Sequence, residues 1–198
     1  MSNYAEIIKQ YLDRLYDPIP MDLAERLPAQ QAGDDFVFQA FGEPCRIGPQ
    51  GIKLGETDET GPKGVIISLY ALQTVPASCQ LTPFKAFREM PDSMPYVGAF
   101  ASHAERVLFD QIDGIESHAD RIAELLKGSK GSDNDAGDFS LIVYPLPKIA
   151  LNYIFYRADD DFPASVTCLF SNNAATFLAT DALADTSEYT SKKMLEIL

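Results

Sequence analysis

The sequence has few of the residues that metal and disulfide sites require. Its 198 residues include two histidines, three cysteines and no tryptophan. A three-histidine zinc site is therefore impossible within one chain, and so is four-cysteine ligation of a metal ion or an iron–sulfur cluster. The cysteines, Cys45, Cys79 and Cys168, are odd in number and widely spaced. This spacing predicts free thiols rather than a disulfide framework.

Positive charge is also scarce along the chain. There are 16 lysines and arginines against 29 acidic residues, which gives a formal net charge of −13. No cluster of lysines and arginines forms a local region of positive charge in the sequence. Such a net negative charge repels phosphate backbones, so we expect no nucleic-acid partner. No apolar run reaches the roughly 18 residues of a membrane span, and residues 1–10 lack the basic start and apolar core of a signal peptide. We therefore expect a soluble, acidic, cytoplasmic protein with no membrane partner.

The common catalytic and ligand-binding motifs are missing as well. The nucleophile elbow of hydrolases, the phosphate-binding loop and the dinucleotide-binding glycine turn are all absent. His103 and Glu105 match part of a zinc deaminase signature, but the cysteine pair that completes it is missing. The segment that starts at Asp133 is similar to a calcium loop, yet Asp138 stands where glycine is needed and Tyr144 where glutamate is needed. No cofactor is predicted from local motifs.

The sequence does contain the composition of a folded protein. Hydrophobic residues make up 46% and charged residues 23%, and a chain of this length suits one domain, 1–198. Alternating or continuous apolar, β-branched and aromatic residues predict strands in both halves of the chain. The expected strands are residues 34–41, 45–47, 51–54, 139–144, 149–156 and 165–170.

Apolar residues spaced three and four apart predict the helices. We expect Thr82 to cap a short helix that begins at Pro83, Gly114 to separate two helices, and Ser171 to cap a short helix that runs through Leu178. The expected helices are residues 4–15, 65–72, 83–89, 97–108 and 115–127, and a final helix capped by Thr180 or Asp181. Together these elements predict a single α+β domain of antiparallel sheets with helices packed on one face.

Several segments in the C-terminal half resemble a known family. They are Leu81–Pro91, Tyr144–Ile149, Phe162–Ala164, Leu169–Ser171 and Phe177–Leu178. The pattern is similar to that of the domain of unknown function numbered 3786, a bacterial and archaeal family. Some members are fused to an iron–sulfur-binding domain. The resemblance thus implies a setting in redox or anaerobic cofactor metabolism and a separate protein partner that carries the cluster.

The candidate ligand-binding residues lie near a proline-containing bend, 145–147. We expect a non-catalytic binding or accessory domain that uses the aromatic residues near this bend. The candidates are Tyr144, Tyr153, Tyr156, Arg88 and His103.

Two alternatives depend on residues that lie far apart in the sequence. An enzyme could use a site that forms only in three dimensions, and the acidic turn 159–161 could join Asp34 and Asp35 to bind a divalent cation. The sequence leaves the oligomeric state open. The enzyme alternative draws on Cys79, Arg88, His103, Glu105, Asp159 and Asp161.

Overall fold

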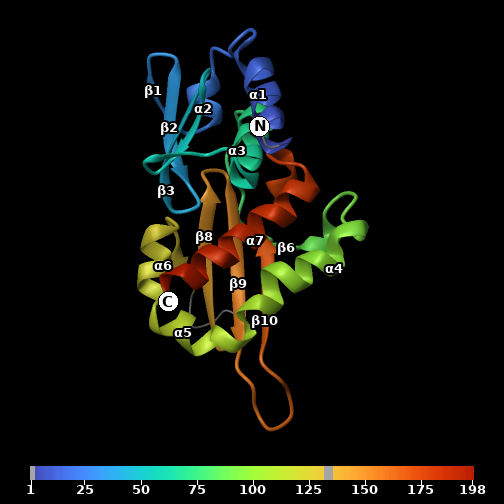
Figure 1. Cartoon of the computed structure of the whole chain (residues 1–198). Coiled ribbons are helices and arrows are strands. Elements are labelled where there is room, and N and C mark those ends of the chain that lie inside the picture. Colours follow the sequence, from blue (N-terminus) through green and yellow to red (C-terminus); the bar gives the residue numbers. More distant parts are fainter. Residues whose placement is uncertain (1–2, 132–135) are drawn as a thin grey trace.

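Two antiparallel sheets organise the chain in the computed structural model, which describes residues 3–131 and 136–198 (Figure 1). The first sheet is a meander in which consecutive strands are neighbours. On β2 the side chains of Phe36 and Phe38 are buried and alternate with less buried residues, which is the pattern of a sheet with one covered face. The strands are β1 (Gln30–Ala32), β2 (Asp35–Ala40), β3 (Glu43–Gly48), β4 (Gly51–Leu54) and β5 (Thr57–Asp58).

The second sheet contains the longest strands and has the order β6-β10-β9-β8-β7. Its central strand β9 is buried along nearly its whole length. Pairing between β8 and β9 is irregular between Val143 and Leu146, because a proline cannot donate to the ladder. The strands are β6 (Lys85–Ala86), β7 (Ser129–Lys130), β8 (Phe139–Leu146), β9 (Ile149–Tyr156) and β10 (Ser165–Phe170).

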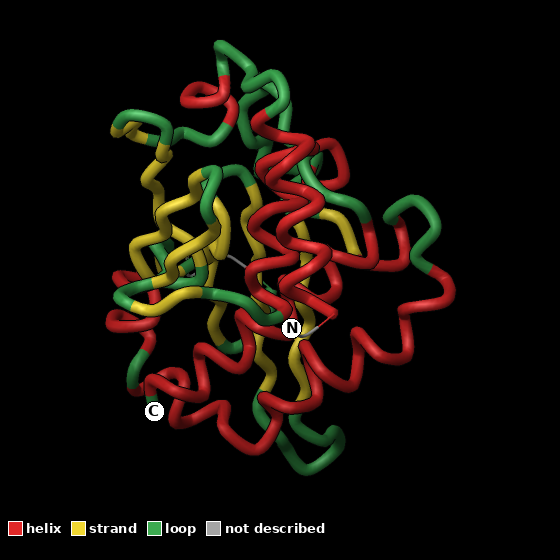
Figure 2. The backbone as a smooth tube through the Cα atoms, turned by 45° about the horizontal axis from the view of Figure 1, so that its top comes forward, coloured by secondary structure: helices red, strands yellow, loops and turns green. Residues whose placement is uncertain are grey.

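Helices lie alongside both sheets (Figure 2). The α-helices are α1 (Asn3–Tyr16), α2 (Leu23–Arg26), α3 (Pro62–Gln73), α4 (Val97–Phe100), α5 (Ile112–Ser117), α6 (Ala119–Leu125) and α7 (Thr180–Ile197). Single 3₁₀ turns are η1 (Phe87–Glu89), η2 (Met94–Tyr96) and η5 (Ala174–Thr176). A longer 3₁₀ segment is η4 (Arg106–Gln111), and η3 (Ala101–Glu105) is a π-helical turn. Among the described residues, none of the helices has the length and apolarity needed to cross a membrane.

Helix α1 packs against α3, and α7 crosses the second sheet (Figure 1). Although α7 is rich in serine and threonine, many of these residues are buried. The hydroxyls of Thr186, Ser187 and Thr190 each donate to the carbonyl four residues earlier. Since these polar groups are satisfied inside the helix, they can lie in the core without a large desolvation penalty. One hydrophobic cluster runs from Ile8 on α1 to Ile197 on α7 and includes residues of both sheets.

The structure confirms the α+β class and most of the expected strands. The prediction of residues 165–170 agrees with β10, and the buried helix expected at 65–72 lies inside α3. The final helix begins at Thr180, so neither Thr180 nor Asp181 is its cap: Ala179 precedes the helix, with no side-chain cap, and the Thr180 hydroxyl donates to Pro91 O at 2.6 Å. Residues 132–135, where the segment similar to a calcium loop begins, lie outside the described residues.

The helix expected at 83–89 is wrong. Lys85 and Ala86 instead form β6, which pairs with Phe170 and Leu169 of β10. The side-chain amide of Asn172 also donates to the Pro83 carbonyl at 3.0 Å. These contacts with a distant part of the chain hold the segment extended, and only the single turn η1 follows.

Three further helix predictions need correction. The stretch expected as one helix at 97–108 is helical but changes pitch, from α4 to the π-helical turn η3 and then to the 3₁₀ segment η4. Gly114 lies inside α5, and the break before α6 falls at His118. Ser171 does not cap a helix, because its hydroxyl accepts from Ala150 N at 3.4 Å and only the turn η5 follows.

Candidate functional site

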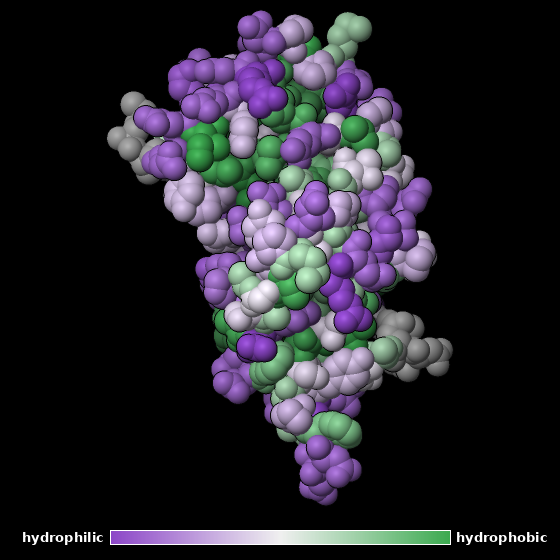
Figure 3. Space-filling model, turned by 90° about the vertical axis from the view of Figure 1, so that its right-hand side faces the viewer, coloured by the Kyte–Doolittle hydropathy of each residue, from purple (hydrophilic) through white to green (hydrophobic). Residues whose placement is uncertain are grey.

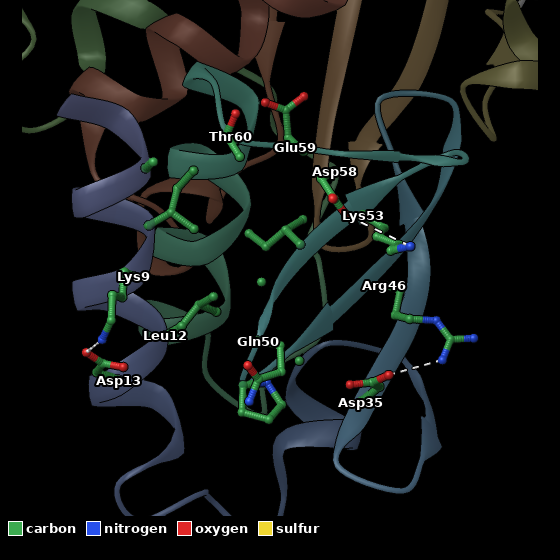
Figure 4. A pocket seen from close by; sticks show the side chains of 16 residues that line it. Lys9, Leu12, Asp13, Asp35, Arg46, Gln50, Lys53, Asp58, Glu59 and Thr60 are labelled. Carbon is green, nitrogen blue, oxygen red and sulfur yellow. Dashed lines mark hydrogen bonds and ion pairs between the residues drawn. The ribbon is translucent and has the colours of Figure 1, made fainter. Parts of the chain in front are cut away.

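A cavity of about 820 Å³ lies between α1 and the first sheet (Figure 4). One wall is α1, and the other is the hairpin of β3 and β4 with the segment that follows it. Gln50 lies at one end of the cavity, and Glu59 and Thr60 lie at the other. The lining residues are Ala5, Ile8, Lys9, Leu12, Asp13, Asp35, Arg46, Gly48, Pro49, Gln50, Gly51, Ile52, Lys53, Asp58, Glu59 and Thr60.

Tyr16 ties the C-terminal end of α1 to the sheet. Its hydroxyl lies 3.1 Å from the Asp34 carbonyl oxygen and 3.2 Å from that of Ile47. Burial and then the nearby charges of Asp35 and Asp34 raise the pKa of Tyr16 well above its usual range. The phenol therefore stays protonated as a hydrogen-bond donor and sets the position of the helical wall.

The opposite wall depends on a close approach between neighbouring strands. Gly48 and Gly51 pair at the end of the β3–β4 hairpin, with Pro49 and Gln50 forming the turn. The Asp35 carboxylate on β2 lies over Gly48, in the space that a Cβ atom there would fill. A glycine at position 48 thus allows this carboxylate to face the cavity.

Ion pairs surround an apolar floor. The floor consists of the buried side chains of Ile8, Leu12 and Ile52. The pairs lie on both walls and are mostly exposed, so each contributes little to stability and can exchange for contacts with a ligand. They are Lys9–Asp13 at 2.6 Å, Arg46–Asp35 at 3.1 Å and Lys53–Asp58 at 3.9 Å.

The three tyrosines expected to form a contact surface do not lie together on the outside. Tyr153 is fully buried, and its hydroxyl lies 3.1 Å from both Ser187 O and Ser191 Oγ of α7. The structure thus removes Tyr153 from the candidate surface, because a side chain on the covered face of β9 cannot reach a ligand outside. Tyr144 is half-buried and Tyr156 is exposed at the end of β9. Burial, followed by the charge of Cys79, raises the pKa of Tyr144.

Arg88 and His103 lie away from the cavity. Arg88 is exposed on the turn η1. His103 Nδ1 lies 2.9 Å from Glu188 Oε2 on α7, so the histidine links η3 to α7. Neither residue lines the cavity.

Glu105, one of the residues of the enzyme alternative, makes a contact with the second sheet. Glu105 Oε1 accepts from the backbone N–H of Cys168 on β10 at 3.0 Å, and burial raises the pKa of Glu105. Strand β6 pairs only with Leu169 and Phe170 of β10. The Glu105 carboxylate therefore accepts a hydrogen bond from Cys168, a residue of β10 that does not pair with β6. Glu105 therefore completes a sheet edge.

The acidic turn after β9 does not join the acidic residues of the first sheet. Asp159 Oδ1 accepts from the backbone N–H groups of Asp161 and Phe162, which closes a turn in the β9–β10 loop. This loop projects from the end of the molecule opposite β1 and β2 (Figure 1, Figure 3). Within residues 3–131 and 136–198, no three histidine, cysteine or acidic side chains are grouped in a way that could hold a metal ion.

Asp35, which the sequence offered only for a divalent-cation site, lines the cavity, and the other lining residues were not among the sequence-based site candidates. Two signals were present, namely the acidic pair Asp34 and Asp35 and the turn 48–51 between two short strands. Neither signal indicates that α1, which ends at Tyr16, forms the other wall.

The fold and the cavity together define the class of protein. It is an α+β protein with two antiparallel five-stranded sheets and a cavity of ligand size beside the first sheet. The chain matches the family described as a domain of unknown function (DUF3786) over residues 20–193, and it belongs to this family. The match confirms the resemblance found in the C-terminal half. No curated protein and no solved structure matches the chain.

Proposed function

We propose that this protein is a non-catalytic binding module that holds a small organic molecule between α1 and the first sheet. The observation that carries the proposal is the cavity itself, with its volume of about 820 Å³. Sites for small molecules commonly have volumes of about 300–1,000 Å³, a mostly apolar lining and a few polar groups that orient the ligand. The apolar floor and the ion pairs around it suit a ligand that has both an apolar part and a polar or charged part.

The side chains of the lining support binding rather than catalysis. The described lining contains no histidine, cysteine, serine or tyrosine, which are common nucleophiles and proton-transfer groups. Three of its four carboxylates, at positions 13, 35 and 58, are each paired with a cation, and the fourth, Glu59, accepts from the backbone N–H of Gly61. Because these three carboxylates already have cations as partners, they are better suited to orienting a ligand than to accepting its protons.

The cellular setting is part of the same proposal. The free cysteines support a reducing compartment such as the cytoplasm. The family resemblance alone supports a bacterial source, a role in redox or anaerobic cofactor metabolism and a protein partner that carries an iron–sulfur cluster. Such a partner would supply the cluster ligands.

A fragment screen against matched variants tests the proposal. We would measure binding of neutral, cationic and anionic fragments by ligand-observed NMR to the wild type, Gln50→Trp and Glu56→Trp. Gln50 lines one end of the cavity, so tryptophan there should fill the space, whereas Glu56 is exposed and outside the lining. We expect fragments that bind the wild type and Glu56→Trp but not Gln50→Trp. Absence of binding at millimolar concentration, or equal binding to all three proteins, would contradict the proposal.

A further inference from the structure

We propose that the ligand of this cavity is an organic cation, a molecule with an ammonium or related group next to an apolar body. This inference rests on the proposed function, because it assigns a chemical class to the ligand of the same cavity. Three features carry it: one carboxylate without an ion pair, the excess of negative charge, and the apolar floor.

Glu59 provides the carboxylate. The other ionised residues of the lining form the three ion pairs described above, and within the described part of the chain no ion pair includes Glu59. Its Oε1 accepts from the backbone N–H of Gly61 at 2.7 Å. This bond fixes the half-buried carboxylate at one end of the cavity (Figure 4). Its other oxygen, Oε2, has no cation as partner among the residues that the structure describes. A positively charged group is the natural partner for such an oxygen.

The charge around the cavity favours the same class of ligand. Four carboxylates and three cations line it, and the whole protein carries a formal net charge of −13. A negative field raises the local concentration of cations and repels anions. An anionic ligand would have to overcome this field and would also leave Glu59 without a partner.

The apolar floor indicates what the cation is attached to. Leu12 on α1 and Ile52 on β4 are both buried and line the space between the two walls. A bare metal ion or an inorganic cation would make no use of these side chains. An alkyl or aryl body would bury apolar surface against them, which favours binding.

A titration with three six-carbon probes tests the class of ligand. Hexylamine, hexanol and hexanoate share the same body and differ in the charge of the end group. We would follow their binding through the backbone amides of Gly48, Gly51 and Ile52 in two-dimensional NMR spectra. We expect hexylamine to bind about tenfold more tightly than hexanol, as a charged hydrogen bond would provide. Hexanoate should bind most weakly.

Two glutamine variants locate the effect. Glu59→Gln keeps an acceptor for the Gly61 N–H but removes the charge, and we expect it to abolish the preference for hexylamine. Glu56→Gln removes the same charge from an exposed residue outside the lining and should leave the preference unchanged. Circular dichroism would verify that both variants are folded.

The possible results separate this inference from the proposed function. If hexanol or hexanoate binds the cavity as tightly as hexylamine, the cationic class is wrong while the binding function stands. If Glu59→Gln and Glu56→Gln weaken hexylamine equally, the preference reflects only the overall charge and the inference is overturned. If no probe shifts the cavity amides but fragments of the screen do, only the inference fails. If neither binds, both fail.

Discussion

Asp35 Oδ1 occupies the space that a side chain on Gly48 would need. The other oxygen of this carboxylate is held by Arg46 Nη1 at 3.1 Å. In Gly48→Ala, only the end of a flexible side chain must move to make room. We expect the free energy of unfolding in urea to change by less than about 0.5 kcal/mol, while the amide resonances of residues 35 and 46 shift because the carboxylate is displaced.

Gly128 is a matched contrast in which the obstacle is backbone. A Cβ atom there would collide with the carbonyl of Ile142 on β8, and β8 cannot move without disturbing the sheet. We expect Gly128→Ala to lower the free energy of unfolding by roughly 1–3 kcal/mol, the usual penalty for overpacking. Equal effects of the two alanine variants in urea unfolding would contradict this account of the two glycines.

The Tyr16 hydroxyl should stabilise the cavity wall measurably. Tyr16→Phe removes the hydrogen bond to the carbonyls of Asp34 and Ile47 and changes nothing else in the side chain. We expect a loss of about 1 kcal/mol in the free energy of unfolding. Tyr4→Phe, on the exposed part of the same helix, serves as the control and should have no effect. An equal loss in the free energy of unfolding for both variants would contradict the stabilising role of the Tyr16 hydroxyl.

The contact between Glu105 and Cys168 predicts a dependence on pH. Burial raises the pKa of Glu105 in the folded protein, so protons bind more tightly to the folded state at this carboxyl. Its contribution to stability is therefore greatest below the unfolded-state pKa and is lost as the pH rises through the higher folded-state pKa. Glu105→Gln keeps an acceptor for the Cys168 N–H without the charge. We expect its stability relative to the wild type to increase across that range of pH.

Two comparisons make this pH prediction specific. Glu105→Ala leaves the Cys168 N–H without its acceptor and should be less stable than Glu105→Gln at every pH, by roughly 1–3 kcal/mol. Glu116→Gln changes an exposed carboxylate that pairs with Arg157. It should not reproduce the pH-dependent gain. Urea unfolding between pH 4 and 8 would provide the measurement, and a gain for Glu105→Gln that is constant with pH would contradict the assigned cause.

The accuracy of the sequence-based predictions depends on whether local or distant contacts decide the structure. The alternation of residues 165–170 is a local pattern that predicts β10 correctly, because every second side chain faces the core. The start signal at Thr82 and Pro83 is also local, but pairing with β10 overrides it. Nothing near Pro83 in the sequence reveals a strand more than eighty residues later.

Local sequence patterns could not predict the candidate site, because contacts between distant segments of the chain form it. The cavity is formed by α1, the β3–β4 hairpin and the segment at 58–60, which meet only in the folded chain. Tyr153 illustrates the converse problem. A tyrosine on an aromatic strand suggests a contact surface, yet α7 covers it with Ser187 and Ser191, which offer the polar partners that its hydroxyl needs.

A crystal structure of the protein with hexylamine tests directly whether the cavity binds an organic cation. We expect the alkyl chain between Leu12 and Ile52, with the amine within hydrogen-bond distance of the Glu59 carboxylate. Hexylamine bound elsewhere, for instance beside Tyr144 or Tyr156, with the space between α1 and the β3–β4 hairpin filled by the protein's own side chains, would contradict it.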